Sequence, residues 1–288
     1  MKKLLLAVFS ITTTFSLYAQ REVPQERMEQ IYEEVKTPYK YGLAIAPADN
    51  HHKIDCPTVF HQGDKWLMTY VVYNGKSGMD GRGYETWIAE SDNLLEWRTL
   101  GRILSYRDGK WDCNQRGGFP ALPDMEWGGS YELQTYKGRH WMTYIGGEGT
   151  GYEAVKAPLY IGLASTKGDI STAHEWESLD KPILSIHDKD AQWWEKLTQY
   201  KSTVYWDKDK TLGVPFVMYY NAGGRHPETD LKGERVGIAL SKDMKTWKRY
   251  PGNPVFAHEA DGTITGDAHI QKMGDVYVMF YFSAFEPS

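Results

Sequence analysis

Four segments of this chain resemble one another, and this repetition limits the possible folds more than any other feature of the sequence. Each segment is rich in aromatic and β-branched residues, which favour packed strands. Three of them follow a tight glycine-containing turn, and a further strand precedes each turn, so each segment closes a hairpin. The repeated segments are 66–70, 141–144, 216–220 and 277–281, and the preceding strands are expected over 58–61, 132–136 and 268–272.

A second hairpin follows the first in each of the three complete copies. It consists of a short strand that ends in serine, a polar turn and then a tryptophan, which is Trp97, Trp176 or Trp247. A last short strand ends each copy, so the unit is four antiparallel strands that recur roughly every 65 to 75 residues. This order is typical of β-propeller blades, because a β-sandwich does not repeat the same succession of turn and tryptophan.

The fourth copy contains only the first hairpin, which ends near residue 282. A propeller closes by pairing its first blade with its last, because open sheet edges invite aggregation. We therefore expect an all-β fold of the five-bladed propeller type, with about three and a half blades present over residues 37–288 and the C-terminal part missing. The alternative is an unusual small propeller that is closed by residues 37–47.

Residues 1–19 have the pattern of a cleaved export signal. Lys2 and Lys3 precede a short apolar stretch, and Leu17-Tyr18-Ala19 resembles a signal-peptidase site. The stretch is too short and too rich in threonine to span a bilayer stably, and its retention as an anchor is the alternative. We expect a signal peptide over 1–19, an N-terminal extension over 20–36, and a periplasmic or secreted protein with no membrane association after cleavage.

Composition and charge exclude several classes of protein. With 41% hydrophobic and 25% charged residues, the chain is globular rather than disordered. Its formal charge of -5 is the opposite of the basic face that a nucleic-acid binder needs. Cys56 and Cys113 allow one disulfide in an oxidising compartment, but the sequence does not fix the distance between them. No cysteine or histidine spacing resembles a zinc site, so we expect no cofactor and at most a structural Ca²⁺ near the propeller axis.

The chemistry of a propeller is expected on the face where loops enter the innermost strands and where loops join the second and third strands. There the chain is dense in carboxylates, arginine, histidine and aromatic residues. Cleavage of a glycosidic bond needs two carboxylates, and aromatic rings stack on sugars, so we expect a carbohydrate partner. The candidate catalytic residues are Asp55, Glu132, Glu195, Asp267 and His269, and the candidate substrate-binding residues are Arg116, Asp124, Glu148, Trp194, Lys201, Arg225 and His226.

The chain resembles the five-bladed propeller glycoside hydrolases, in particular family 43 and the related families 32, 117 and 130. Three features carry the resemblance: Asp55-Cys56-Pro57 at the opening of the first blade, the serine–turn–tryptophan hairpins at 91–97 and 241–247, and Met-Tyr-Tyr at 218–220. The resemblance implies that Asp55 is the general base or the carboxylate that positions water. A purely structural role for Asp55 is to cap the entry turn by accepting backbone N–H groups.

The general acid must stay protonated near neutral pH, through burial or a neighbouring charge. Glu195 is one candidate, because it follows two tryptophans that can supply an apolar wall. Glu132 is a second, because it lies nearest the expected start of an inner strand. Glu148 and Glu153, from the loop after the second hairpin segment, stay open as further candidates.

Asp124 and Asp267 are candidates for tuning the pKa of that acid, and each also fits a simple turn cap. His269 opens the fourth inner strand. The resemblance implies a role near the propeller axis there, because family 43 proteins place a histidine at this position and family 117 proteins use one as an acid. A hydrogen-bonded structural histidine is the alternative.

Arg116 and Arg225 bear on the choice of substrate, because an arginine fork binds carboxylate or phosphate with two hydrogen bonds. If both reach the pocket, they fit an acidic substrate or a phosphate acceptor; the alternative is an ion pair at the rim. The sequence as a whole predicts an exported glycoside hydrolase of poly- or oligosaccharides, and the resemblance implies inversion and action from the end of the glycan. Two other functions stay open: a phosphorylase similar to family 130, and a non-catalytic carbohydrate-binding propeller.

Overall fold

The structure is a computed structural model that describes residues 22–37, 40, 42–47, 49, 52–75, 81–154, 158–258 and 262–284. The chain divides into two compact units, Met1–Tyr39 and Lys40–Ser288. The described part of the first unit contains the helix α1 (Gln25–Val35), in which Ile31 is buried. The export signal expected over 1–19 lies outside the described residues. Among the described helices, none has the length and apolar character needed to cross a membrane.

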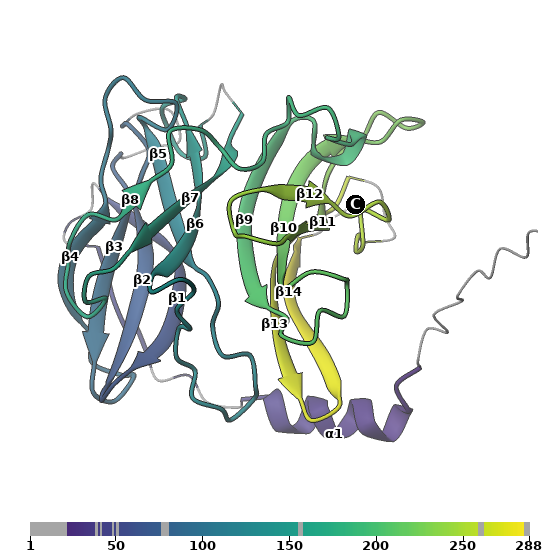
Figure 1. The fold of residues 1–288 in the computed structure, drawn as a ribbon, viewed down its shortest axis with the longest axis horizontal. Helices are drawn as coiled ribbons and strands as arrows, with labels where there is room; N and C mark the ends of the chain where they lie inside the picture. Colours follow the sequence, from purple (N-terminus) through teal and green to yellow (C-terminus); the bar gives the residue numbers. More distant parts are fainter. Residues whose placement is uncertain are drawn as a thin grey trace, which may run out of the picture. The chain divides into compact units, whose positions relative to one another are not determined.

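The second unit is built almost entirely of antiparallel strands (Figure 1), as the repeats predict. Three sheets have four strands each, arranged in chain order, and a fourth has two strands. The first sheet contains β1 (Lys53–Gln62), β2 (Lys65–Tyr73), β3 (Tyr84–Ser91) and β4 (Arg98–Leu104). The second contains β5 (Gln115–Pro120), β6 (His140–Gly147), β7 (Tyr160–Thr166) and β8 (Glu177–Ser178). The third contains β9 (Thr198–Trp206), β10 (Phe216–Arg225), β11 (Lys232–Ser241) and β12 (Trp247–Arg249). The 3₁₀ turn η1 (Trp193–Glu195) precedes β9. The last sheet contains β13 (Ile264–Met273) and β14 (Val276–Ala284).

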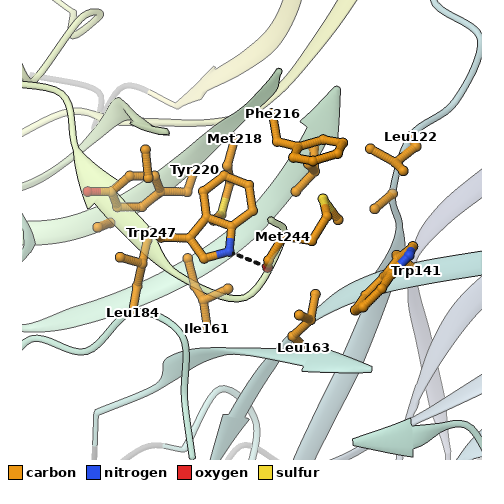
Figure 2. Close-up of a cluster of buried hydrophobic side chains, with 14 of the residues drawn as sticks. Leu122, Trp141, Ile161, Leu163, Leu184, Phe216, Met218, Tyr220, Met244 and Trp247 are labelled. Carbon is orange, nitrogen blue, oxygen red and sulfur yellow. Dashed lines mark hydrogen bonds between the residues drawn. The ribbon is translucent and has the colours of Figure 1, made fainter. Parts of the chain in front are cut away.

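The repeated serine–turn–tryptophan motif has a local physical cause. The Oγ atom of Ser241 accepts the backbone N–H groups of Asp243 and Met244, which closes the turn after β11. The indole of Trp247 then donates to the Met244 carbonyl over 2.6 Å (Figure 2). Ser91 closes the corresponding turn after β3 in the same way. The motif therefore fixes the turn between the third and fourth strands of a sheet.

Neighbouring sheets pack face to face in the order of the chain. A cluster of buried side chains joins the second and third sheets, with Trp141 and Leu163 on one side and Phe216 and Tyr220 on the other (Figure 2). A second cluster joins the first and second sheets in the same manner. The structure thus has the blade-by-blade arrangement of a partial propeller, as the sequence predicts.

The inner strand of the second sheet is not the segment 132–136 that the repeats indicate. It is β5, which reads Gln-Arg-Gly-Gly-Phe-Pro and pairs with β6 from Gln115 to Pro120. Glycine and proline are poor strand formers, so propensity hides this strand. Packing explains the glycine at position 118, because a Cβ atom there would lie 2.4 Å from the sulfur of Met142. Residues 132–136 instead belong to a long connection between β5 and β6.

Three of the four inner strands carry a β-bulge at the same end. In each, three steps along the inner strand match two steps along its partner, so one residue is extra. Cys56 and Asp267 lie within two of these bulges with φ of 49° and 56°, a left-handed conformation that is uncommon for residues other than glycine. A bulge re-aims the side chains beside it. The bulges lie between Asp55 and Thr58, between Gln199 and Ser202, and between Gly266 and His269.

Candidate active site

A cavity of about 390 Å³ lies where the three bulged strands begin. Its charged lining consists of Asp55, Glu153, Lys201, Glu234 and Asp267. Its aromatic lining consists of Tyr84, Phe119, Tyr152, Tyr200 and Phe282. Carboxylates, one ammonium group and aromatic rings therefore meet in a space whose size is typical of small-ligand pockets.

Asp55 is held by two hydrogen bonds of different origin. Its Oδ1 atom accepts the backbone N–H of Cys56 over 2.7 Å, which is the local turn cap that a structural role requires. Its Oδ2 atom accepts the hydroxyl of Tyr152 over 2.8 Å, and Tyr152 belongs to the connection between β6 and β7. The carboxylate at the opening of the first sheet is thus tied to a loop of the second sheet.

The cavity raises the pKa of both Glu234 and Glu153. Glu234 lies near the beginning of β11, and burial together with the charge of Glu153 raises its pKa to about 7. Burial also raises the pKa of Glu153, and the charges of Asp55 and Asp267 add to that rise. Burial and neighbouring negative charges thus raise the pKa of both carboxyl groups, and perturbed carboxyl pairs of this kind are typical of acid–base sites.

Asp267 and Lys201 form an ion pair in the same cavity lining. The Nζ atom of Lys201 lies 3.7 Å from Oδ2 of Asp267 and 5.5 Å from the ring centre of Phe119. Burial raises the pKa of Asp267, while the charge of Lys201 works against that rise. Lys201 is the only basic residue in the cavity lining among the residues that the structure describes, so the site as a whole is acidic.

Glu195 and Trp194 lie in the core of the third sheet and not in the lining of this cavity. The carboxylate of Glu195 is completely buried and accepts hydrogen bonds from Arg249 over 2.7 Å and from Gln199 over 3.0 Å. The tryptophan wall expected beside Glu195 is present. It comes with a buried arginine, however, which gives the glutamate a partner of opposite charge.

Arg116 is also buried, and its guanidinium pairs with Asp112 at 3.2 Å and with Glu175 at 2.6 Å. Arg225 is exposed and pairs with Asp230 at 3.5 Å, so it takes the alternative role of a surface ion pair. Neither arginine lines the cavity. The acidic substrate or phosphate acceptor that the two forks suggest therefore has no arginine to bind it among the described lining residues.

The remaining predicted residues are distributed over other parts of the second unit. Glu132 and Asp124 line a separate cavity of about 420 Å³, where Asp124 accepts hydrogen bonds from Ser130. Glu148 is exposed, and the ring of His226 packs edge-on against Trp193. His269 follows the β13 bulge and hydrogen-bonds to Gln271 over 2.8 Å, and burial lowers its pKa. Of the twelve predicted residues, the first cavity gathers Asp55, Lys201 and Asp267.

Several residues of the cavity were not among the predicted site residues, namely Glu234, Tyr152, Tyr200 and Asn221. The sequence gives a signal for two of them, on the face where chemistry is expected. Tyr152 belongs to the connection between β6 and β7, and Glu234 lies near the start of β11, just after the connection from β10. The sequence gives no such signal for Asn221, because it lies within the repeated strand of the third copy, where a side chain is expected to pack in the core.

Both cysteines are free thiols, so the optional disulfide between Cys56 and Cys113 is absent. Cys56 lines the cavity, and burial followed by the charge of Asp55 raises the pKa of its thiol to about 12. In the described part of the sequence, no three metal-ligating side chains of histidine, cysteine, aspartate or glutamate come together.

The chain is similar to solved glycoside hydrolases. No protein-family model and no curated protein matches the chain. A solved glycoside hydrolase is 94% identical to it, covers 92% of this chain and 76% of its own, and superposes with a TM-score of 0.91. A solved complex of BT0996 and RGII is 95% identical over the same shares of both proteins, also with a TM-score of 0.91.

The near-identity to a solved glycoside hydrolase identifies an enzyme that cleaves glycosidic bonds. At this level of identity and coverage, the chain plainly belongs to the glycoside hydrolases. A more distant likeness extends to Zg3597, a family 117 glycoside hydrolase of the marine bacterium Zobellia galactanivorans. That protein is 15% identical, covers 81% of this chain and 67% of its own, and has a TM-score of 0.54, so it shows the shared fold alone.

Proposed function

We propose that Glu234 is the general acid of this glycosidase and that Glu153 is its ionised partner. Glu234 gives its proton to the glycosidic oxygen as the bond from that oxygen to the anomeric carbon breaks. Water forms the new bond to the anomeric carbon and passes its proton to Glu153, so protons and electrons balance. The observation that carries this assignment is the raised pKa of Glu234, caused by burial and by the Glu153 charge beside it.

Asp55 is the base that the family resemblance implies, and it lies beside this pair. Its charge raises the pKa of Glu153, and it binds the hydroxyl of the preceding residue, Tyr152. We propose that Asp55 fixes the loop that carries Glu153 and that its charge raises the pKa of Glu153. We propose that Glu153 accepts the proton of the attacking water. Asp55→Asn and Glu153→Gln separate the two roles. Our assignment expects the larger loss of kcat, about 10²–10⁴-fold, from Glu153→Gln. The reverse ranking would return the base to Asp55.

The substrate we propose is a neutral part of an RGII oligosaccharide, cleaved from one end of the glycan. Two observations support it: a relative 95% identical to this protein was solved as a complex of BT0996 and RGII, and the cavity is small and acidic. The course we propose is inversion, which the resemblance to family 43 implies, together with a five-bladed arrangement. We also propose export to the periplasm or the cell exterior, which the signal pattern at 1–19 supports.

One experiment tests the proposal as a whole. The protein is incubated with RGII oligosaccharides and with a panel of aryl glycosides, with and without inorganic phosphate and with a chelator. Sugar release is followed by NMR of the anomeric proton. We expect hydrolysis that needs neither phosphate nor metal, and a first-formed product of inverted configuration. Phosphate dependence would identify a phosphorylase, and binding without turnover would identify a carbohydrate-binding protein.

A further inference from the structure

We infer that Asn221 is a positioning residue of the general acid and that it determines which oxygen of Glu234 carries the transferred proton. This inference rests on the proposed function, in which Glu234 is the acid. Asn221 is 3% exposed, lies on β10 and lines the cavity. It sits opposite the bulge of β9, where the register between β10 and β9 shifts, while its pairing with Val236 on β11 stays regular.

The two ends of the Asn221 amide meet different partners. Its Oδ1 atom accepts the backbone N–H of Asp267 over 3.4 Å, and its Nδ2 atom donates to Oε2 of Glu234 over 3.3 Å. A backbone N–H can only donate, so Oδ1 has to face Asp267 and Nδ2 has to face Glu234. The bulge of β13 therefore sets the orientation of the amide.

This orientation places the proton of the acid. In a protonated carboxyl group the carbonyl oxygen is a better hydrogen-bond acceptor than the hydroxyl oxygen. Nδ2 of Asn221 thus keeps Oε2 of Glu234 as an acceptor and leaves the proton on Oε1. A general acid transfers its proton within a narrow range of distance and direction, so fixing the donor oxygen matters for the rate.

The packing around Asn221 supports a fixed orientation. A Cβ atom on Gly266 would lie only 2.5 Å from Nδ2 of Asn221, so glycine at this position is what lets the amide reach Glu234. Gly266 is also the residue at which the β13 bulge begins. Three elements, β10, β11 and β13, therefore converge on one side chain.

The charge environment gives the inference a measurable consequence. Burial raises the pKa of Glu234, the charges of Glu153 and Asp267 raise it further, and Lys232 lowers it. Tyr200 also lines the cavity, and burial together with the charge of Glu234 raises the pKa of its hydroxyl. The hydrogen bond from Asn221 also lowers the pKa of Glu234. Loss of this bond should therefore move the deprotonation of the acid to higher pH.

The test compares two substrates of the sugar that the panel selects, one with a dinitrophenyl and one with an alkyl leaving group. Only the poor leaving group needs a proton from the acid. For Asn221→Ala we expect kcat on the alkyl glycoside to fall about 10-fold or more, with kcat on the dinitrophenyl glycoside changed less than about 2-fold. We also expect the alkaline limb of the pH profile to move to higher pH. Asn221→Ser is made in parallel, in case alanine prevents folding, and should give the same pattern.

The matched control is Asn253→Ala. The Asn253 side chain hydrogen-bonds to the N–H and C=O of Ile238 on β11, the same strand that carries Glu234, and it does not line the cavity. We expect it to lower stability without changing the leaving-group dependence. In Glu234→Gln, a further Asn221→Ala change should cost no additional activity. Any of three results would overturn the inference: equal losses on both substrates, an alkaline limb that does not move, or additive losses in the double variant. Full alkyl-glycoside activity in Glu234→Gln would instead overturn the assignment of Glu234 as the acid.

Discussion

The hydroxyl of Tyr152 and the carboxylate of Asp55, which are 97 positions apart in the sequence, share a 2.8 Å hydrogen bond. The bond joins the connection after β6 to the bulge at the opening of β1. Glu153 follows Tyr152 directly, so the same bond holds the loop that brings Glu153 into the cavity. The catalytic arrangement we propose thus depends on contact between two blades.

Removal of this bond should weaken catalysis without unfolding the protein. For Tyr152→Phe we expect kcat/KM to fall about 10-fold or more, because a hydrogen bond to a charged group contributes about 1.5–3 kcal/mol. The ring is kept, so its edge contacts with Tyr73 and Tyr84 remain. Tyr160→Phe is the control, because its hydroxyl meets His187 outside the cavity. Equal kinetics for the two variants would show that the Asp55 bond has no role in the reaction.

The pH dependence of the enzyme should carry the signature of Glu234. Because its pKa is about 7, we expect kcat/KM to fall as the pH rises through 7 and the acid loses its proton. The raised pKa also means that the folded state holds this proton more tightly than the unfolded chain. The stability linked to Glu234 is therefore present below about pH 4.5, its ordinary pKa, and is lost as the pH rises through about 7.

Glu234→Gln should remove both effects, which thermal melts and initial rates across pH 5–9 can measure. Glu148→Gln serves as the control, because Glu148 is exposed and outside the cavity. An alkaline limb that persists in Glu234→Gln would assign the titration to another group.

The buried ion pair of the third sheet should govern stability and not chemistry. In Arg249→Met, the completely buried Glu195 loses its cation, and we expect about 3–5 kcal/mol of destabilisation in urea unfolding. Arg225→Met removes an exposed pair and should cost less than about 1 kcal/mol. If the two variants unfolded at the same urea concentration, the buried Arg249–Glu195 pair would contribute no more to stability than the exposed pair.

The two cysteines should form no disulfide. We expect the purified protein to show two free cysteines by thiol titration in denaturant, with no mass loss from a disulfide. In the folded state Cys56 should react slowly with iodoacetamide at pH 8, because its pKa of about 12 leaves almost no thiolate. Fast alkylation of Cys56 in the native protein would show that the cavity wall opens.

The sequence predicts the sheets well because their causes are local. Alternating strands, glycine turns and the serine–turn–tryptophan motif act within a few residues. The first and third sheets contain the hydrogen-bonded motif as predicted. Strand propensity does not predict β5, because its glycines are required by distant neighbours. Gly118 leaves room for Met142, which lies 24 positions later in the chain, and Gly117 packs against Ile145 and Val71.

The site was harder to predict than the fold because its causes are distant. Glu195 follows two tryptophans and so has the local environment expected of an acid, but Arg249, 54 positions later, gives it a buried partner. Asp55, Lys201 and Asp267 were found because all three lie at strand openings. The bulges decide which of the adjacent residues also face the cavity. One extra residue in a strand moves the side chains that follow it to the opposite face of the sheet.

The three bulges also suggest how such an enzyme can change its preference for sugars. A single-codon insertion or deletion at a strand opening alters the side chains presented to the ligand, while the ladder further along that strand keeps its pairing. Evolution can therefore revise the recognition surface one residue at a time and leave the packing between blades untouched.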